Sequence, residues 1–180
     1  GAKVYDYTGK NNGTAVGNAA QTTAGKMGDA FSVDGDGDYV NFGNSQNLNI
    51  TTPNITISGW IFRKFDSGVI EAIIGKYKVD NEQRSYLMNI NELDKLSFSV
   101  YGDGTGTSVY RRESTNTVNT DVWVHFAAVY NRTAIEIYVN GIKIEQNGSV
   151  ILGEPAEILC NKSFAVKYRV KNNGNFNETI

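Results

Sequence analysis

Apolar and polar residues alternate along most of the chain, and short clusters of glycine, asparagine and aspartate interrupt the alternation. A period of two residues puts apolar side chains on one face of a β-strand, whereas a helix needs a period near 3.6. No sustained helical period occurs. The pattern therefore predicts an all-β chain, either a sandwich or a barrel. The expected strands cover residues 31–33, 38–42, 55–62, 72–77, 85–89, 95–101, 108–113, 123–130, 134–139 and 142–146.

The clearest local signal is the stretch "AIEIYVNGIKIEQ". Asn140-Gly141 is the preferred pair for a two-residue type I′ hairpin, because both positions need positive φ. Such a turn sets the register of the two strands. It predicts that Val139 faces Ile142, that Ile137 faces Ile144 and that Tyr138 faces Lys143.

The stretch "LSFSVYGDGTGTSVYRR" predicts a second hairpin with residues 102–107 as its loop. If Tyr101 pairs with Ser108, then Tyr101, Tyr110 and Arg112 share the polar face of the sheet. In that register Arg111 falls on the core face. Either Arg111 lies at the end of the sheet, or the register is different.

Length and composition exclude several classes of protein. A chain of 180 residues is long enough for one domain with a hydrophobic core, and we expect residues 1–180 to form a single domain. The net charge of −2 gives no basic surface for nucleic acid. No apolar run reaches the roughly 20 residues of a membrane-spanning helix. The single cysteine, Cys160, excludes an internal disulfide framework.

Five phrases, in order, resemble the laminin-G-like domains of the concanavalin A-like lectin/glucanase superfamily. They are "VYDYTGKNNGTAVGNA", "GKMGDAFSVDGDGDYVNFGNS", "ITISGWI", "LSFSVYGDG" and "DVWVHFAAVYNRTAIEIYVNGIKI". The resemblance implies a two-sheet antiparallel jelly-roll sandwich. It also implies that Trp60 and Trp123 lie in the core and that His125 has a structural role.

The resemblance covers residues 4–146 and fades after Gly148. Members of the family usually close with a strand like "F-x-G-x-I-D-E-V-R-I-Y", and this chain reaches "NFNETI" where that strand should continue. A start at Gly1 without methionine also indicates a fragment of a larger protein. We therefore expect a domain that lacks the usual closing strand; the alternative is a carboxyl end that is arranged differently.

The stretch "FSVDGDGDYVNFG" places Asp34, Asp36 and Asp38 at alternate positions. Three carboxylates so spaced are candidate ligands for calcium, which prefers oxygen. An EF-hand is excluded, because its sixth and twelfth positions would hold Tyr39 and Ser45. The other interpretation is a turn, in which the carboxylates accept hydrogen bonds from nearby backbone N–H groups.

A catalytic interpretation has little support. Glycoside hydrolases need two carboxylates beside the scissile bond, and glucanases of this fold carry them on a strand of the form Glu-x-Asp-x-x-Glu. The nearest segment, "ELDKLSF", has Glu92 and Asp94 but Ser97 in place of the second glutamate. The resemblance also makes this segment a turn. We therefore predict no enzymatic activity.

The best candidate for a ligand surface is the predicted polar face of the second hairpin. Aromatic rings stack on the C–H faces of sugars, while carboxylates and guanidinium groups bond sugar hydroxyls. The expected ligand-binding residues are Tyr101, Asp103, Tyr110 and Arg112.

The favoured function is therefore a non-catalytic, extracellular recognition module. Its partner would be a carbohydrate, or otherwise a cell-surface protein. Seven Asn-x-Ser/Thr sequons, which are glycosylation sites in secreted proteins, give weak support for an extracellular location. The alternatives are a glycoside hydrolase or polysaccharide lyase on the same fold, and a structural or adhesion module with no sugar ligand.

Overall fold

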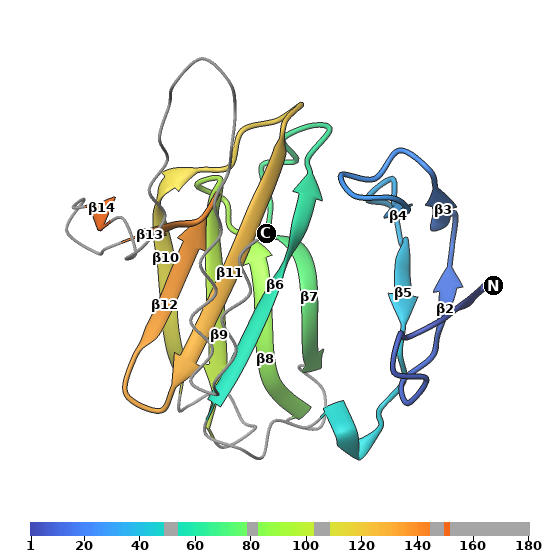
Figure 1. Cartoon of the computed structure of the whole chain (residues 1–180), viewed down its shortest axis with the longest axis horizontal. Coiled ribbons are helices and arrows are strands. Elements are labelled where there is room, and N and C mark those ends of the chain that lie inside the picture. Colours follow the sequence, from blue (N-terminus) through green and yellow to red (C-terminus); the bar gives the residue numbers. More distant parts are fainter. Residues whose placement is uncertain (49–53, 79–82, 103–108, 145–149, 152–180) are drawn as a thin grey trace, which may run out of the picture.

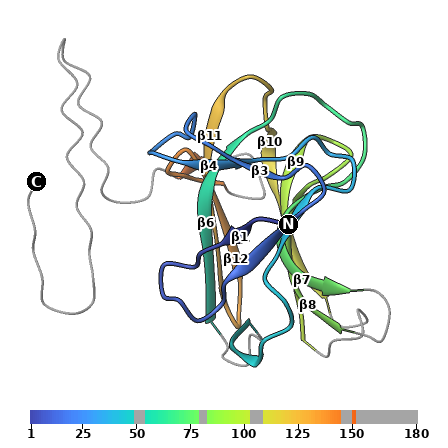
Figure 2. The same cartoon turned by 90° about the vertical axis from the view of Figure 1, so that its right-hand side faces the viewer.

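A computed structural model describes residues 1–48, 54–78, 83–102, 109–144 and 150–151 of the chain. Two larger antiparallel sheets face each other, and the amino-terminal strands lie beside them (Figures 1 and 2). The predicted two-sheet antiparallel sandwich is confirmed.

The five-stranded sheet has the order β14-β13-β12-β11-β6. Each residue of β6 pairs with a residue of β11, from Asn54 opposite Asn131 to Phe62 opposite Trp123. Strand β6 forms one edge of the sheet. The strands are β6 (Asn54–Phe62), β11 (Trp123–Asn131), β12 (Ile135–Val139), β13 (Ile142–Ile144) and β14 (Val150–Ile151).

The four-stranded sheet has the order β10-β9-β8-β7. Its pairing is regular between β8 and β9 and shifts register in β7 and at the far end of β10. The strands are β7 (Glu71–Lys78), β8 (Gln83–Ile90), β9 (Lys95–Tyr101) and β10 (Val109–Thr117).

The amino-terminal strands form two small sheets, β1-β2-β5 and β3-β4. A short 3₁₀ turn, η1 (Gln46–Leu48), then leads toward the sandwich. Figure 1 shows this part beside β7, on the side away from β12. The strands are β1 (Lys3–Val4), β2 (Gly13–Val16), β3 (Ala20–Thr22), β4 (Ala30–Ser32) and β5 (Tyr39–Asn41).

The hydrophobic core lies between the two larger sheets and takes alternate residues from each strand. Phe98, Met88 and Leu96 of the four-stranded sheet pack there with Ile137 and Phe126 of the five-stranded sheet. Full burial of one such side chain contributes about 1.5–3 kcal/mol relative to leaving it in water. The alternation of period two thus produces the sandwich, because it gives each strand one face to bury.

The predicted Asn-Gly hairpin is confirmed. Asn140 and Gly141 have φ values of 51° and 79°, so both adopt the positive φ of a type I′ turn. Strands β12 and β13 pair Val139 with Ile142, Tyr138 with Lys143, and Ile137 with Ile144.

Candidate functional site

The predicted register between β9 and β10 is wrong by one residue. Tyr101 pairs with Val109, not with Ser108, so Tyr110 lies opposite Val100 and Arg112 opposite Phe98. Val100 and Phe98 are buried in the core, and directly paired residues point to the same side of a sheet. Tyr110 and Arg112 therefore lie on the inner face of β10, and Arg111 moves to the outer face.

The observed register explains why the predicted one put the charged Arg111 on the core face. A one-residue slip exchanges the two faces of a strand, so a hairpin loop one residue longer than predicted moves Arg111 away from the core. Tyr110 is half exposed at the margin of the sandwich, where its ring meets Tyr130 of the opposite sheet with centroids 5.5 Å apart. Asp103 lies outside the described residues. The structure thus does not bring Tyr101 and Tyr110 onto one face.

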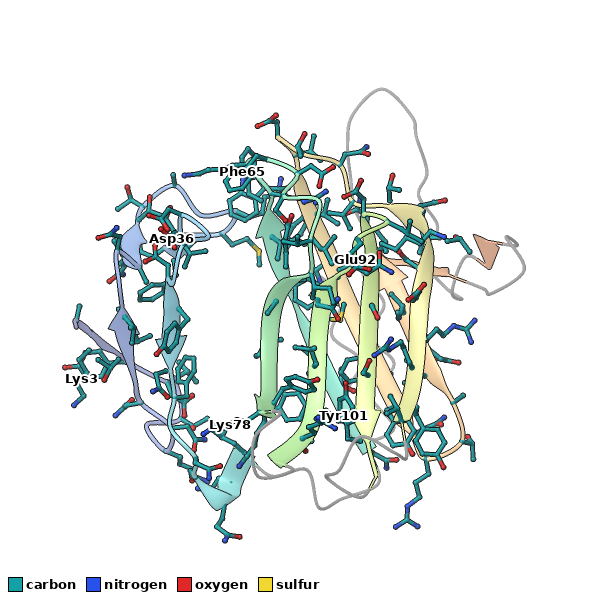
Figure 3. All side chains as sticks on the ribbon, turned by 180° about the vertical axis from the view of Figure 1, so that it is seen from behind. Lys3, Asp36, Phe65, Lys78, Glu92 and Tyr101 are labelled. Carbon is teal, nitrogen blue, oxygen red and sulfur yellow. The ribbon has the colours of Figure 1, made fainter. Side chains whose placement is uncertain are left out.

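Tyr101 instead lies beside Tyr77 on the outer face of the four-stranded sheet, the side turned away from the core. The two ring centroids are 5.4 Å apart, with an interplanar angle of 50°. The guanidinium of Arg84 lies 5.7 Å from the centroid of the Tyr77 ring, within cation–π range. Figure 3 shows the sheet from this side, with Tyr101 labelled toward one end.

Small polar residues form the floor of this outer face beside the two tyrosines. Going along β9 from Tyr101, Ser99 pairs with Leu87 of β8, and Ser97 then pairs with Asn89. Ser97 and Ser99 are buried although they face away from the core. Arg111 donates a hydrogen bond from Nε to Oγ of Ser99 at 3.0 Å. The result is a polar surface with aromatic rings at one end.

The Asp34–Asp38 loop forms a hydrogen-bonded turn. Asp34 Oδ1 accepts the N–H of Asp36, and Asp38 Oδ2 accepts the N–H of Asp34. The other two oxygens accept the backbone N–H and the side-chain amide of Asn18. The N–H of Asp36, followed by the amide of Asn18, lowers the pKa of the Asp34 carboxyl. These bonds support the turn interpretation, and the described residues contain no cluster of three or more His, Cys, Asp or Glu side chains arranged for a metal.

An arginine network that the sequence did not suggest lies at the end of the sandwich where β6 ends. The Arg63 side chain is buried, and its Nε and Nη2 donate to both carboxylate oxygens of Glu71 at 2.9 and 2.8 Å. Its Nη1 lies 2.8 Å from Oδ1 of Asp94, and Nη2 also contacts Asp66 at 2.9 Å. A guanidinium satisfied in this forked way is held in one orientation.

The same arginine joins loops that are distant in sequence. Its Nη1 donates to the carbonyl of Val118, and its own carbonyl accepts the N–H of Asp121. The N–H of Val118 in turn donates to the carbonyl of Asp94 at 2.6 Å. Residues from the β6–β7, β8–β9 and β10–β11 connections therefore meet at one side chain.

The position of Asp94 can be compared with that of the acids in the Glu-x-Asp-x-x-Glu strand of glucanases. Glu92 and Asp94 lie in the turn between β8 and β9, as predicted, and Asp94 has a φ of 60°. A catalytic pair of this family needs its acids on one face of a strand. Asp94 is instead bound to Arg63 at the end of the sheet.

The predicted burial of Trp60 and Trp123 is wrong. Trp60 lies opposite His125 and Phe62 opposite Trp123 on the outer side of the five-stranded sheet, and Trp60 is 36% exposed. The Trp60 and His125 centroids are 5.2 Å apart, edge to face, and those of Phe62 and Trp123 are 5.5 Å apart. His125 therefore packs against a ring on the sheet surface and not inside the sandwich.

Comparison with known families supports the relationship that the sequence phrases indicate. Residues 34–163 match the laminin-G-type family model described as "Concanavalin A-like lectin/glucanases superfamily". No curated protein and no solved structure shows a significant match. Among the described residues, no helix has the length and apolar character needed to cross a bilayer.

Proposed function

Because this chain belongs to the concanavalin A-like lectin/glucanase superfamily, we propose that it is a non-catalytic recognition module that binds carbohydrate. The proposed ligand surface is the outer face of the four-stranded sheet. The observation that carries the proposal is the Tyr77–Tyr101 ring pair, with the exposed Arg111 on the same face of the sheet.

The chemistry of this face suits a sugar. A pyranose ring has C–H faces that pack on aromatic rings and hydroxyl groups that exchange hydrogen bonds with polar side chains. Tyr77 and Tyr101 offer the rings, and the exposed Arg111 on the same face offers a guanidinium group. Each hydrogen bond exchanged with water contributes only about 0.5–1.5 kcal/mol, so we expect micromolar to millimolar dissociation constants.

We propose that the module does not cleave its ligand. Of the two acids that resemble half of the glucanase motif, Asp94 is engaged by Arg63 and Glu92 lies in the neighbouring turn. We further propose an extracellular location, in keeping with the sequons at Asn12, Asn54 and Asn131, all of which are exposed residues.

The test is a glycan array followed by titration calorimetry with the best ligand. Tyr77→Ala and Tyr101→Ala should each weaken binding about tenfold, corresponding to about 1.4 kcal/mol, without a change in the circular dichroism spectrum. Tyr110→Ala is the matched control, because its ring packs on Tyr130 at the inner margin, and it should bind like the parent protein. An equal loss in all three variants would refute the assignment of the face. Release of reducing sugar from the bound glycan would refute the non-catalytic claim.

A further inference from the structure

Apolar side chains gather at the end of the sandwich where β6 ends, far from the tyrosine pair. They come from the β6–β7, β8–β9 and β10–β11 connections, and they are between 46% and 65% exposed. Figure 3 labels Phe65 and Glu92 at this end and Tyr101 and Lys78 at the opposite end. We call this surface the loop end. Its apolar members are Phe65, Val69, Ile70, Leu93 and Val122.

The loop end is a fixed surface. Arg63 binds Asp66, Glu71 and Asp94, so it holds the loops that carry Phe65 and Leu93 in a set relation. The β4–β5 loop also belongs to this surface, since a Cβ atom at Gly35 would lie 3.5 Å from Cζ of Phe65. An apolar surface that is already ordered loses little conformational entropy when it is covered.

The charge at the loop end is negative. The loops that form this surface carry exposed carboxylates at Asp36, Asp66, Glu92 and Asp121. Arg63 is buried and neutralised by its partners, which leaves Lys64 as the exposed cation in these described loops. A partner for this surface should therefore combine apolar side chains with positive charge.

One segment of the same chain has this composition. Residues 158–177 contain no aspartate or glutamate, and they carry Lys162, Lys167, Arg169 and Lys171. Phe164, Val166, Tyr168 and Val170 alternate with the polar positions in the middle of this segment. The segment lies outside the described residues. The last described residue before the segment is Ile151. The extended chain from Ile151 to Lys162 spans about 36 Å. This length is more than twice the radius of gyration of a domain of this size, so the segment can reach the loop end.

We propose that residues 162–171 dock on the loop end of the same molecule. The apolar side chains of the segment cover Phe65, Leu93 and their neighbours, and its cations face the surrounding carboxylates. Because the segment is covalently attached, its effective concentration at the loop end is high, and weak contacts suffice. Salt weakens the docking, because exposed charges are screened over about 8 Å at physiological ionic strength.

The single cysteine gives a direct test in the 180-residue chain. A nitroxide label on Cys160 should broaden the amide signals of residues 64–70 and 91–94 in a nitrogen-15 spectrum. Broadening within one molecule must be distinguished from broadening between molecules. For this control, nitroxide-labelled protein without nitrogen-15 is mixed with nitrogen-15 protein that carries no label. Broadening that persists in the mixture would overturn the proposal in favour of contact between molecules. Broadening confined to β6 would overturn it in favour of pairing with that strand.

Charge exchange tests the contact without a label. Lys167→Glu/Arg169→Glu should abolish the hydrogen-exchange protection of the loop-end amides, whereas Lys3→Glu/Lys78→Glu, with sites away from the loop end (Figure 3), should not. Adding Asp36→Lys/Glu92→Lys to the first variant should restore protection, since the pairs are then reversed. Protection that is unchanged by the first variant, or that the reversed pair fails to restore, would refute the charge complementarity on which the proposal rests.

Discussion

Replacement of Arg63 by methionine should destabilise the domain strongly. Methionine retains much of the side-chain volume, so the loss is chiefly that of charge. The change leaves Glu71 and Asp94 partly buried without their cation, and both side chains are no more than a third exposed. Breaking a buried ion pair from one side costs about 3–5 kcal/mol. Asp66 is half exposed and adds less than about 1 kcal/mol.

We therefore expect a loss of about 3 kcal/mol in the free energy of unfolding, near the lower end of that range because water reaches both carboxylates. For a chain of this length, this corresponds to a fall in Tm of about 6–12 °C. Urea unfolding followed by tryptophan fluorescence measures it. Lys64→Met is the matched control, since Lys64 is exposed and adjacent, and it should change stability by less than about 0.5 kcal/mol.

The same replacement should change the dependence of stability on pH. Burial raises the pKa of the Glu71 carboxyl, but hydrogen bonds from Arg63 and Ser67 outweigh burial and lower the pKa below its ordinary value of 4.5. A carboxyl with a lowered folded-state pKa stabilises the fold above pH 4.5, and this stabilisation disappears as the pH falls through the folded-state value. Arg63→Met should flatten this acid limb. A variant within 1 kcal/mol of the parent protein, with an unchanged acid limb, would refute the reasoning.

Two further predictions concern the core and the aspartate loop. Gly59→Ala should lower stability by about 1–3 kcal/mol in a thermal melt, because the new Cβ would lie 3.1 Å from Cζ of Phe126 in a packed interior; an unchanged Tm would mean that the ring yields freely. The domain should melt at the same temperature with millimolar calcium as with chelator. Each of the four carboxylate oxygens of Asp34 and Asp38 already accepts a hydrogen bond, from the loop's own N–H groups or from Asn18. A rise in Tm with calcium that disappears in Asp36→Asn would instead establish the metal interpretation.

Much of the fold could be predicted from local pattern. The Asn140-Gly141 turn sets its own register, because both residues readily adopt the positive φ of a two-residue type I′ turn. The β9–β10 hairpin carries no such signal in "GDGTGTS", which is compatible with several loop lengths. The misplaced charge of Arg111 was the one residue-level indication that the predicted register was wrong.

The candidate site depended on information that alternation lacks. Period two shows that a strand has two faces, but not which of them is buried when both carry large apolar side chains, as β6 does with Trp60 and Phe62 on one face and Ile57 and Ile61 on the other. The arginine network was not predictable, because Arg63 and Asp94 meet through the folding of separate strands. Tyr77 and Tyr101 likewise come from strands separated by β8, so only the assembled sheet places their rings together.

The position of β6 at the edge of its sheet has a consequence for the behaviour of the chain in solution. Among the described strands, only β11 pairs with β6, so the backbone N–H and C=O groups along its other side have no strand partner there. Proteins usually protect such an edge with proline or charged side chains, and the sequence "NITISGWIF" has neither. Within the described strands, β6 is therefore an edge at which β-augmentation can occur. An extended segment that pairs with this edge gains a ladder of backbone hydrogen bonds. The segment can come from the same polypeptide or from another molecule.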